Sequence, residues 1–193
     1  MIKVVLGGPP RSGKSVLRQG LKDAIISQSG NAIYPLVITA CPDGEGAWFQ
    51  EAAANNSELA AECKQRYKGK FTPEFVEMRA EQVQKCVMLI SIIDIGGLVD
   101  PFNETICASA THAVLLSRTE EQFLEWEVFC GKLKLEVIGK LISDYHATED
   151  LVHHTEVGLR GRVHHLERGE DVSARPAIVA LAELLLRVCG AKK

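Results

Sequence analysis

Eight residues near the start of the chain, from Gly8 to Ser15, constrain its fold more than any other segment. They read G-P-P-R-S-G-K-S and match the pattern G-x-x-x-x-G-K-[S/T] in full. An apolar run at residues 2–6 precedes them, and an amphipathic segment at residues 14–27 follows them. A glycine-rich turn between a buried strand and a helix is the arrangement that wraps a polyphosphate. The segment therefore predicts a P-loop protein that binds a nucleoside triphosphate.

The residues inside this loop have separate expected roles. Pro9 and Pro10 lack an amide hydrogen, so the amides that cradle the phosphates must come from the residues after them. The ammonium group of Lys14 is expected to reach the β- and γ-phosphates, and the hydroxyl of Ser15 is expected to coordinate Mg²⁺. The residues expected to bind the nucleotide here are Gly8, Pro9, Pro10, Arg11, Ser12, Gly13, Lys14, Ser15 and Val16.

The rest of the chain alternates short apolar runs with longer amphipathic segments. Five runs rich in branched residues lie at 2–6, 33–39, 87–95, 113–116 and 135–142. Helix starts are predicted at Thr72, Asp100 and Thr119, and a last helix at about residues 176–188. This alternation indicates an α/β fold of the P-loop NTPase class, in which helices cover both faces of a central five-stranded, mostly parallel sheet. We expect a single domain over residues 1–193, with a helical insertion at about 46–86.

Composition narrows the class of protein further. The net charge is −3, so no global positive field attracts nucleic acid or membrane surfaces. No apolar run approaches the roughly 18 residues of a membrane-spanning helix, and the apolar start is too short for a signal peptide. Six cysteines occur without any C-x-x-C pair, which argues against a zinc or thioredoxin-type site. We expect a cytoplasmic protein without a membrane partner.

A second acidic element follows the third apolar run. The run ends in Asp94-Ile95-Gly96-Gly97, which places an aspartate at the tip of a buried strand. In P-loop proteins such an aspartate helps to hold Mg²⁺, and the amide of Gly97 could sense a γ-phosphate. The alternative is an aspartate that caps a helix or turn. Ile95 stands where motor-type ATPases place a catalytic glutamate, and the lack of an N-K-x-D motif favours ATP over GTP.

The loop after the second apolar run carries two further carboxylates, Asp43 and Glu45. Glycines flank them, and the loop is expected at the same sheet edge as the phosphate loop. Either carboxylate could accept a proton from an acceptor hydroxyl or from water, or help to hold Mg²⁺. The alternative is a solvated turn. The candidate catalytic residues are thus Lys14, Asp43, Glu45 and Asp94, and the candidate metal ligands are Ser15 and Asp94.

Basic residues form two groups outside the phosphate loop. Arg160, Arg162 and Arg168 lie among glycines late in the chain, and such arginines can close over a transferring phosphate. Surface arginines are the alternative. A second basic group at residues 64–70 indicates either a solvated helix end or a patch for an RNA backbone. The pairs His153-His154 and His164-His165 are typical of surface or hydrogen-bonded histidines.

Six motifs in order resemble one P-loop group: G-P-P-R-S-G-K-S, A-C-P-D-G-E-G-A-W, F-T-P-E-F-V-E, D-I-G-G, E-W-E-V-F-C and L-E-R-G. The chain resembles the ATPase-like module that is fused to, or encoded near, CRISPR-associated ring nucleases, which degrade cyclic oligoadenylates in type III systems. The resemblance covers Met1 to about Leu186. It implies ATP and Mg²⁺ binding by Gly8 to Ser15 and Asp94, and a site role for Asp43 and Glu45.

The same resemblance limits the expected activity. In that group the nuclease is a separate domain before the P-loop module, whereas this chain begins almost at its first predicted strand. We therefore expect no nuclease activity. The resemblance points to a ring-nuclease protein, an oligoadenylate or RNA as the partner.

Three functions remain open from the sequence. The first is an Mg²⁺-dependent ATPase or nucleotide-dependent regulatory module in antiviral RNA signalling. The second is a small-molecule or nucleoside kinase, in which the attacking hydroxyl comes from the substrate. The third is a non-enzymatic switch or homo-oligomeric scaffold that binds ATP and seldom cleaves it.

Overall fold

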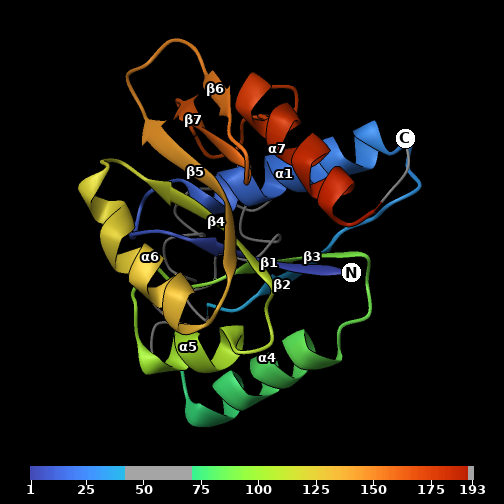
Figure 1. Cartoon of the computed structure of the whole chain (residues 1–193), viewed down its shortest axis with the longest axis vertical. Coiled ribbons are helices and arrows are strands. Elements are labelled where there is room, and N and C mark those ends of the chain that lie inside the picture. Colours follow the sequence, from blue (N-terminus) through green and yellow to red (C-terminus); the bar gives the residue numbers. More distant parts are fainter. Residues whose placement is uncertain (42–70, 191–193) are drawn as a thin grey trace.

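The computed structural model describes residues 1–41 and 71–190. Within these residues seven strands form one sheet in the order β2-β3-β1-β4-β5-β7-β6 (Figure 1). Every neighbouring pair is parallel except β6 with β7. The strands are β1 (Ile2–Gly7), β2 (Leu36–Thr39), β3 (Ile90–Asp94), β4 (His112–Ser117), β5 (Glu136–Asp144), β6 (Leu151–His154) and β7 (Leu159–His164). The expected α/β fold with a mostly parallel sheet is confirmed.

The expected number of five strands was wrong, because β6 and β7 were missed. Their sequences are rich in histidine, arginine and glycine and were interpreted as a flexible segment. In β7, however, Leu159 and Val163 are buried while Arg160 is exposed. This alternation is the period of a half-buried strand, and it could have been recognised from the sequence. β6 is a short antiparallel strand at the edge of the sheet, where few side chains become buried.

The helices begin where the capping residues predict, with one small shift. They are α1 (Lys14–Gln28), α4 (Pro73–Lys85), α5 (Pro101–Cys107), α6 (Glu121–Lys132) and α7 (Pro176–Val188). The Thr72 hydroxyl accepts a hydrogen bond from the Phe75 amide at 3.3 Å, and Asp100 Oδ1 accepts one from Asn103 at 2.8 Å. α6 begins at Glu121, two residues after Thr119. Of the insertion expected at about 46–86, the described part contains α4, and residues 46–70 lie outside the described residues.

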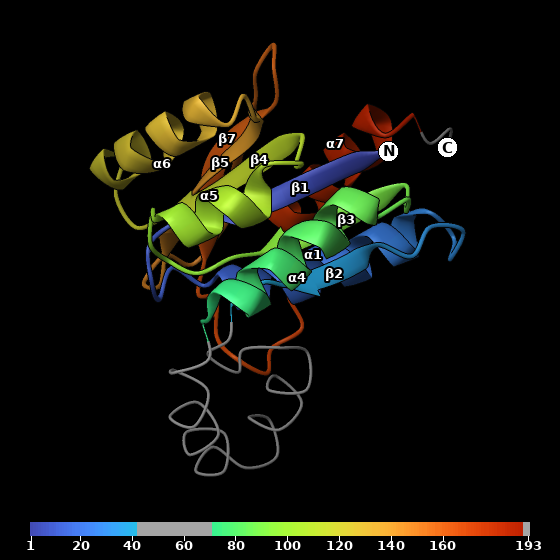
Figure 2. The same ribbon diagram turned by 90° about the horizontal axis from the view of Figure 1, so that it is seen from below.

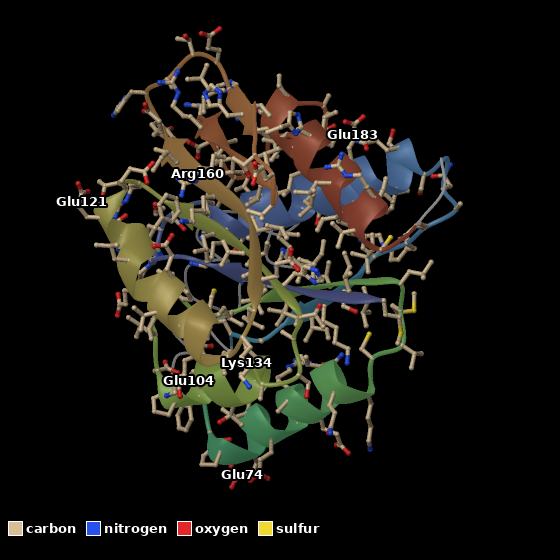
Figure 3. The ribbon with its side chains drawn as sticks, viewed as in Figure 1. Glu74, Glu104, Glu121, Lys134, Arg160 and Glu183 are labelled. Carbon is tan, nitrogen blue, oxygen red and sulfur yellow. The ribbon has the colours of Figure 1, made fainter. Side chains whose placement is uncertain are left out.

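Helices cover both faces of the sheet, and each face has its own apolar core. α1 and α7 lie side by side on one face, whereas α4, α5 and α6 cover the other (Figures 1 and 2). Leu17 and Leu21 of α1 pack with Leu181 of α7 in the first core. Trp126 and Phe129 of α6 belong to the second core. A salt bridge at 2.5 Å between Glu104, labelled on α5 in Figure 3, and Lys132 joins two of these helices.

The parallel pairing of the strands brings the loops that follow them to one edge of the sheet. β1 lies between β3 and β4, and all three run in the same direction, so their carboxyl ends meet. The ends of β2 and β5 lie at the same edge, one strand further out on either side. Ligands of open parallel sheets collect at this edge.

None of the helices within the described residues combines the length and the apolar composition that a membrane-spanning helix needs.

Asp150 joins the late strands to α7. Its side chain is fully buried, and it accepts hydrogen bonds from the His164 amide at 2.9 Å and from the Ala177 amide at 3.0 Å. The ring Nδ1 of His164 lies 2.6 Å from Asp150 Oδ1. One carboxylate therefore ties the loop before β6 to the end of β7 and to the first turn of α7.

We predict that Asp150→Ala destabilises the protein by about 3 kcal/mol, because the amides of His164 and Ala177 and the ring of His164 lose their shared, fully buried partner. The free energy of unfolding in urea measures this. Glu149→Ala is the matched control, since the neighbouring side chain is exposed, and it should change stability by less than about 0.5 kcal/mol. Equal stability of the two variants would show that Asp150 does not hold these elements together.

Candidate functional site

The segment from Gly8 to Gly13 joins β1 to α1 through three residues with left-handed or otherwise positive φ. These are Gly8 at 142°, Arg11 at 60° and Gly13 at 92°. A Cβ on Gly8 would lie 1.8 Å from the carbonyl oxygen of Leu116 in β4, so only glycine fits there. Because β1 is the neighbour of β4, this close approach sets where the loop leaves the sheet.

The first turn of α1 is open to an anion. Gly13 is the N-cap residue of α1, and having no side chain it makes no side-chain hydrogen bond to the helix. The first amides of a helix need acceptors from outside the helix, and the helix dipole favours a negative charge there. The loop and the helix start together form the kind of backbone cradle that the sequence predicts.

Lys14 lies at the start of α1 with its side chain folded back toward the loop. Its Nζ donates hydrogen bonds to the carbonyl oxygens of Gly8 at 2.7 Å and of Pro9 at 2.9 Å. The side chain is largely buried. The ammonium group therefore lies inside the curve of the loop, at the place where the sequence predicts contact with phosphate oxygens.

Asp94 lies beside this loop because β3 is the direct neighbour of β1. Leu6 of β1 is in register with Asp94 at the end of β3. The carboxylate is buried, and its Oδ2 accepts a hydrogen bond from Nη1 of Arg18 at 2.8 Å. The exposed fractions of the two side chains are 1% for Arg18 and 7% for Asp94, so this is an ion pair inside the protein.

Arg18 was missed in the sequence analysis. It lies four residues after Lys14 on α1, and residues at this spacing share a face of a helix. Since Lys14 faces the sheet edge, Arg18 had to face it as well, one turn deeper. The sequence thus contained a signal for this ion pair, although only the sheet order shows that Asp94 is its partner.

Gly97 packs against the phosphate loop. A Cβ on Gly97 would lie 2.5 Å from the backbone nitrogen of Pro10, so the two loops touch backbone to backbone. Residues 94–97 and the loop from Gly8 to Ser15 therefore lie directly against each other.

A cavity of about 680 Å³ lies between these elements. Its walls come from the phosphate loop and α1 start at residues 10–16, from Thr39 and Cys41 after β2, from residues 94–97, and from Tyr145 with residues 166–168. The structure thus gathers Pro10, Arg11, Ser12, Gly13, Lys14, Ser15, Val16, Asp94 and Gly97 around one space. Gly8 and Pro9, which were also expected to bind the nucleotide, are not among the residues that line this cavity.

The three arginines near the end of the chain lie in two different places. Arg160, labelled in Figure 3, and Arg162 lie on β7, where a flexible closing segment was expected. Neither of them lines the cavity. Arg162 Nη1 lies 4.0 Å from Asp144 Oδ2. Arg168 does line the cavity, because the chain after β7 returns across the phosphate loop.

Contacts on both sides hold this returning segment in place. Leu166 packs on Gly13 so closely that a Cβ on the glycine would lie 2.7 Å from it. Glu167 accepts a hydrogen bond from the Tyr145 hydroxyl, which raises the pKa of Tyr145 and lowers that of Glu167. The ring of His165 packs against that of Tyr145 at a tilt of 37°, with centroids 4.4 Å apart. Tyr145, Leu166 and Glu167 were not anticipated from the sequence.

The donor set of the cavity fits Mg²⁺ together with a polyphosphate. Ser15 and Asp94 offer a hydroxyl and a carboxylate oxygen, which are the ligand types that Mg²⁺ prefers. Within residues 1–41 and 71–190 no group of three or more His, Cys, Asp or Glu side chains forms a metal cluster. The Oγ of Ser12 is buried and has no hydrogen-bond partner within the described residues.

Several predicted residues lie elsewhere. Asp43, Glu45 and the basic group at 64–70 fall outside the described residues. His164 bonds Asp150, and the ring Nδ1 of His165 lies 3.2 Å from the carbonyl oxygen of Tyr145, so this pair is hydrogen-bonded as expected.

Comparison of the chain with models of known protein families and with curated proteins found no match.

We predict that Arg18→Met destabilises the ligand-free protein by about 3 kcal/mol, because it leaves Asp94 buried beside an apolar side chain. Adding Asp94→Asn should recover part of this loss, since the buried charge that faced Arg18 is then gone. Urea unfolding of the single and double variants measures both effects. Arg187→Met, at an exposed arginine of α7, is the control and should be nearly neutral. A double variant less stable than Arg18→Met would contradict the ion pair as the cause.

Proposed function

We propose that this protein binds a nucleoside triphosphate with Mg²⁺ in the 680 Å³ cavity and transfers or hydrolyses its terminal phosphate. One arrangement carries the proposal: the uncapped start of α1, the Lys14 ammonium group and the Asp94 carboxylate all face the same space. Each of the three suits a different part of a polyphosphate–metal complex. The fold alone would not support this, since α/β sheets host many activities.

Different residues of the cavity would bind different parts of the nucleotide–Mg²⁺ complex. The backbone amides of Arg11 to Ser15 would donate hydrogen bonds to phosphate oxygens, and the ammonium group of Lys14 would exchange its carbonyl partners for them. Ser15 and Asp94 would hold Mg²⁺, which supplies charge neutralisation at the β- and γ-phosphates. Arg18 would fix the orientation of the Asp94 carboxylate through their ion pair. Arg168 would bring a second cation from the returning segment.

The resemblance to the CRISPR-associated module supports an ATPase or regulatory role in antiviral RNA signalling. A ring-nuclease protein, an oligoadenylate or RNA remains the proposed partner of that role. Asp43 and Glu45 remain the proposed groups that accept a proton there. In this form the protein would cleave ATP slowly by itself and faster with its partner.

One structural feature favours the kinase alternative. The cavity extends past Asp94 to Thr39 and Cys41 at the end of β2, which leaves room beside the phosphate loop on the side of β3 and β2. A phosphate acceptor entering there would approach the terminal phosphate with its own hydroxyl, so no water-activating base would be needed. The third alternative, a homo-oligomeric switch, would bind the nucleotide in the same cavity but would seldom cleave it.

We predict that Lys14→Ala weakens binding of ATP–Mg²⁺ by about 100-fold or more, because the charge-assisted contacts to the phosphates are lost. Isothermal titration calorimetry measures this, and circular dichroism checks that the variant is folded. Lys22→Ala is the matched control, since Lys22 lies on the same helix with its Nζ 4.8 Å from the Tyr34 ring centroid and does not line the cavity. Unchanged binding by folded Lys14→Ala protein would refute the proposal.

We further predict that one class of added partner raises ADP release by about tenfold or more. Nucleosides and sugars test the kinase, whereas cyclic oligoadenylates and RNA test the signalling role. Release that responds to none of these, despite measured ATP binding, would leave the switch as the function. Size-exclusion chromatography with and without ATP–Mg²⁺ then tests that switch directly.

A further inference from the structure

The outer side of α6 carries two large apolar side chains that face solvent. Leu124 is 64% exposed and Val128 is 73% exposed. They are four residues apart, so they lie on the same side of the helix. The opposite side, with Phe123, Trp126 and Phe129, is buried in the second core. In Figure 2, α6 lies at the outside of the molecule, with no other described element over its outer side.

Gly131 continues this outer side and has no packing role within the described residues. It follows Val128 by three residues and is exposed in the last turn of α6. A Cβ at this position would meet no described atom within 4 Å, so packing inside the chain does not require a glycine there. Glycine is less favourable than alanine in a helix. Its physical effect here is to leave the backbone open to close approach from outside. We call Leu124, Val128 and Gly131 the outer stripe.

Charge is separated between the two ends of α6. Glu121 and Glu125 lie in its first half, whereas Lys132 and Lys134 lie at its end and just after it. Figure 3 shows Glu121 and Lys134 at opposite ends of the helix. Lys132 is paired with Glu104 of α5. Within the described residues neither Glu121 nor Lys134 has an ion-pair partner.

A second α6 that runs in the opposite direction would match this helix along its length. Antiparallel alignment places Leu124 of one copy against Val128 of the other, and a two-fold axis repeats this contact. Glu121 of each copy then lies near Gly131 and Lys134 of the other copy. A parallel alignment would bring like charges together at both ends. The charge pattern of α6 is thus complementary to itself, which favours a second copy of this chain over an unrelated helix.

We propose that two copies of this protein associate through α6, with their outer stripes packed antiparallel about a two-fold axis. The surface is continuous only over a helix of 12 residues. Because so small an interface gives weak binding, the dissociation constant should be about 100 µM. None of the residues from Glu121 to Lys134 lines the 680 Å³ cavity, so this inference goes beyond the proposed function and does not depend on it.

Sedimentation equilibrium of the full chain, from about 5 to 500 µM, tests the association, because the dimer fraction must rise with concentration. Val128→Glu should raise the dissociation constant about tenfold or more, since it places a carboxylate in the centre of the apolar contact. Val87→Glu is the matched control. Val87 is 76% exposed and lies outside α6, so the same substitution there should leave the association unchanged. Circular dichroism checks that both variants are folded.

Charge reversal tests the antiparallel direction. Glu121→Lys and Lys134→Glu should each weaken the dimer about threefold or more, because each places like charges across the interface. The two changes in one chain should restore the affinity to within about twofold, since opposite charges then face each other again.

Gly131→Gln separates the role of the outer stripe from that of the fold. Glutamine is the better helix former, so the melting temperature of the dilute protein should rise by about 1–3 °C. The dimer should nevertheless weaken about fivefold or more, because the new side chain occupies the space of the approaching helix.

A protein that stays monomeric over the whole concentration range would overturn the inference. A dimer that Val128→Glu leaves intact, or that Val87→Glu disrupts equally, would do the same, because association would then use another surface. A doubly charge-reversed chain that associates no better than the single variants would refute the antiparallel packing. All of these results would leave the proposed nucleotide site untouched.

Discussion

The close approach of Gly8 to β4 is the constraint on which the rest of the site depends. At this point the chain leaves β1, and the carbonyl oxygen of Leu116 occupies the space that any side chain would need. The turn must therefore be tight, and the following residues must curl over the carboxyl end of the sheet before α1 begins at Lys14. Because β1 is flanked by β3 and β4, the loop has a neighbour on each side. β3 contributes Asp94 to the site, and β4 contributes the Leu116 carbonyl oxygen that fixes the course of the loop.

Charge is arranged around this loop at two depths. At the surface of the cavity, the start of α1 and the Lys14 ammonium group provide positive potential for an anion. One helical turn below, Arg18 and Asp94 compensate each other in the interior. A buried carboxylate without such a partner would carry a large desolvation cost. The ion pair therefore explains how an acidic group can be kept at this depth beside the phosphate loop.

Residues 166–168, which follow β7, form one wall of the cavity. This segment is held by Leu166 on Gly13, by Glu167 on Tyr145, and by Arg175, which bonds the carbonyl oxygens of His164 and His165 and forms a salt bridge with Glu170. Leu166 of this segment lines the 680 Å³ cavity and also a second cavity of about 560 Å³, whose walls include Arg118 and Asp144, so the segment spans the boundary between the two. A ligand lying along the phosphate loop would pass beneath it.

The sequence by itself determined the local parts of this protein. The match from Gly8 to Ser15, the caps at Thr72 and Asp100, and the apolar runs of β1 and β3 are short-range patterns, and short-range sterics and hydrogen bonding suffice to specify them. Only the tertiary structure decided which parts meet. The pairing of Arg18 with Asp94, the return of residues 166–168 over the loop, and the second cavity beside Asp144 all join segments far apart in the chain. Their proximity follows from the order of strands in the sheet, and no single segment encodes that order.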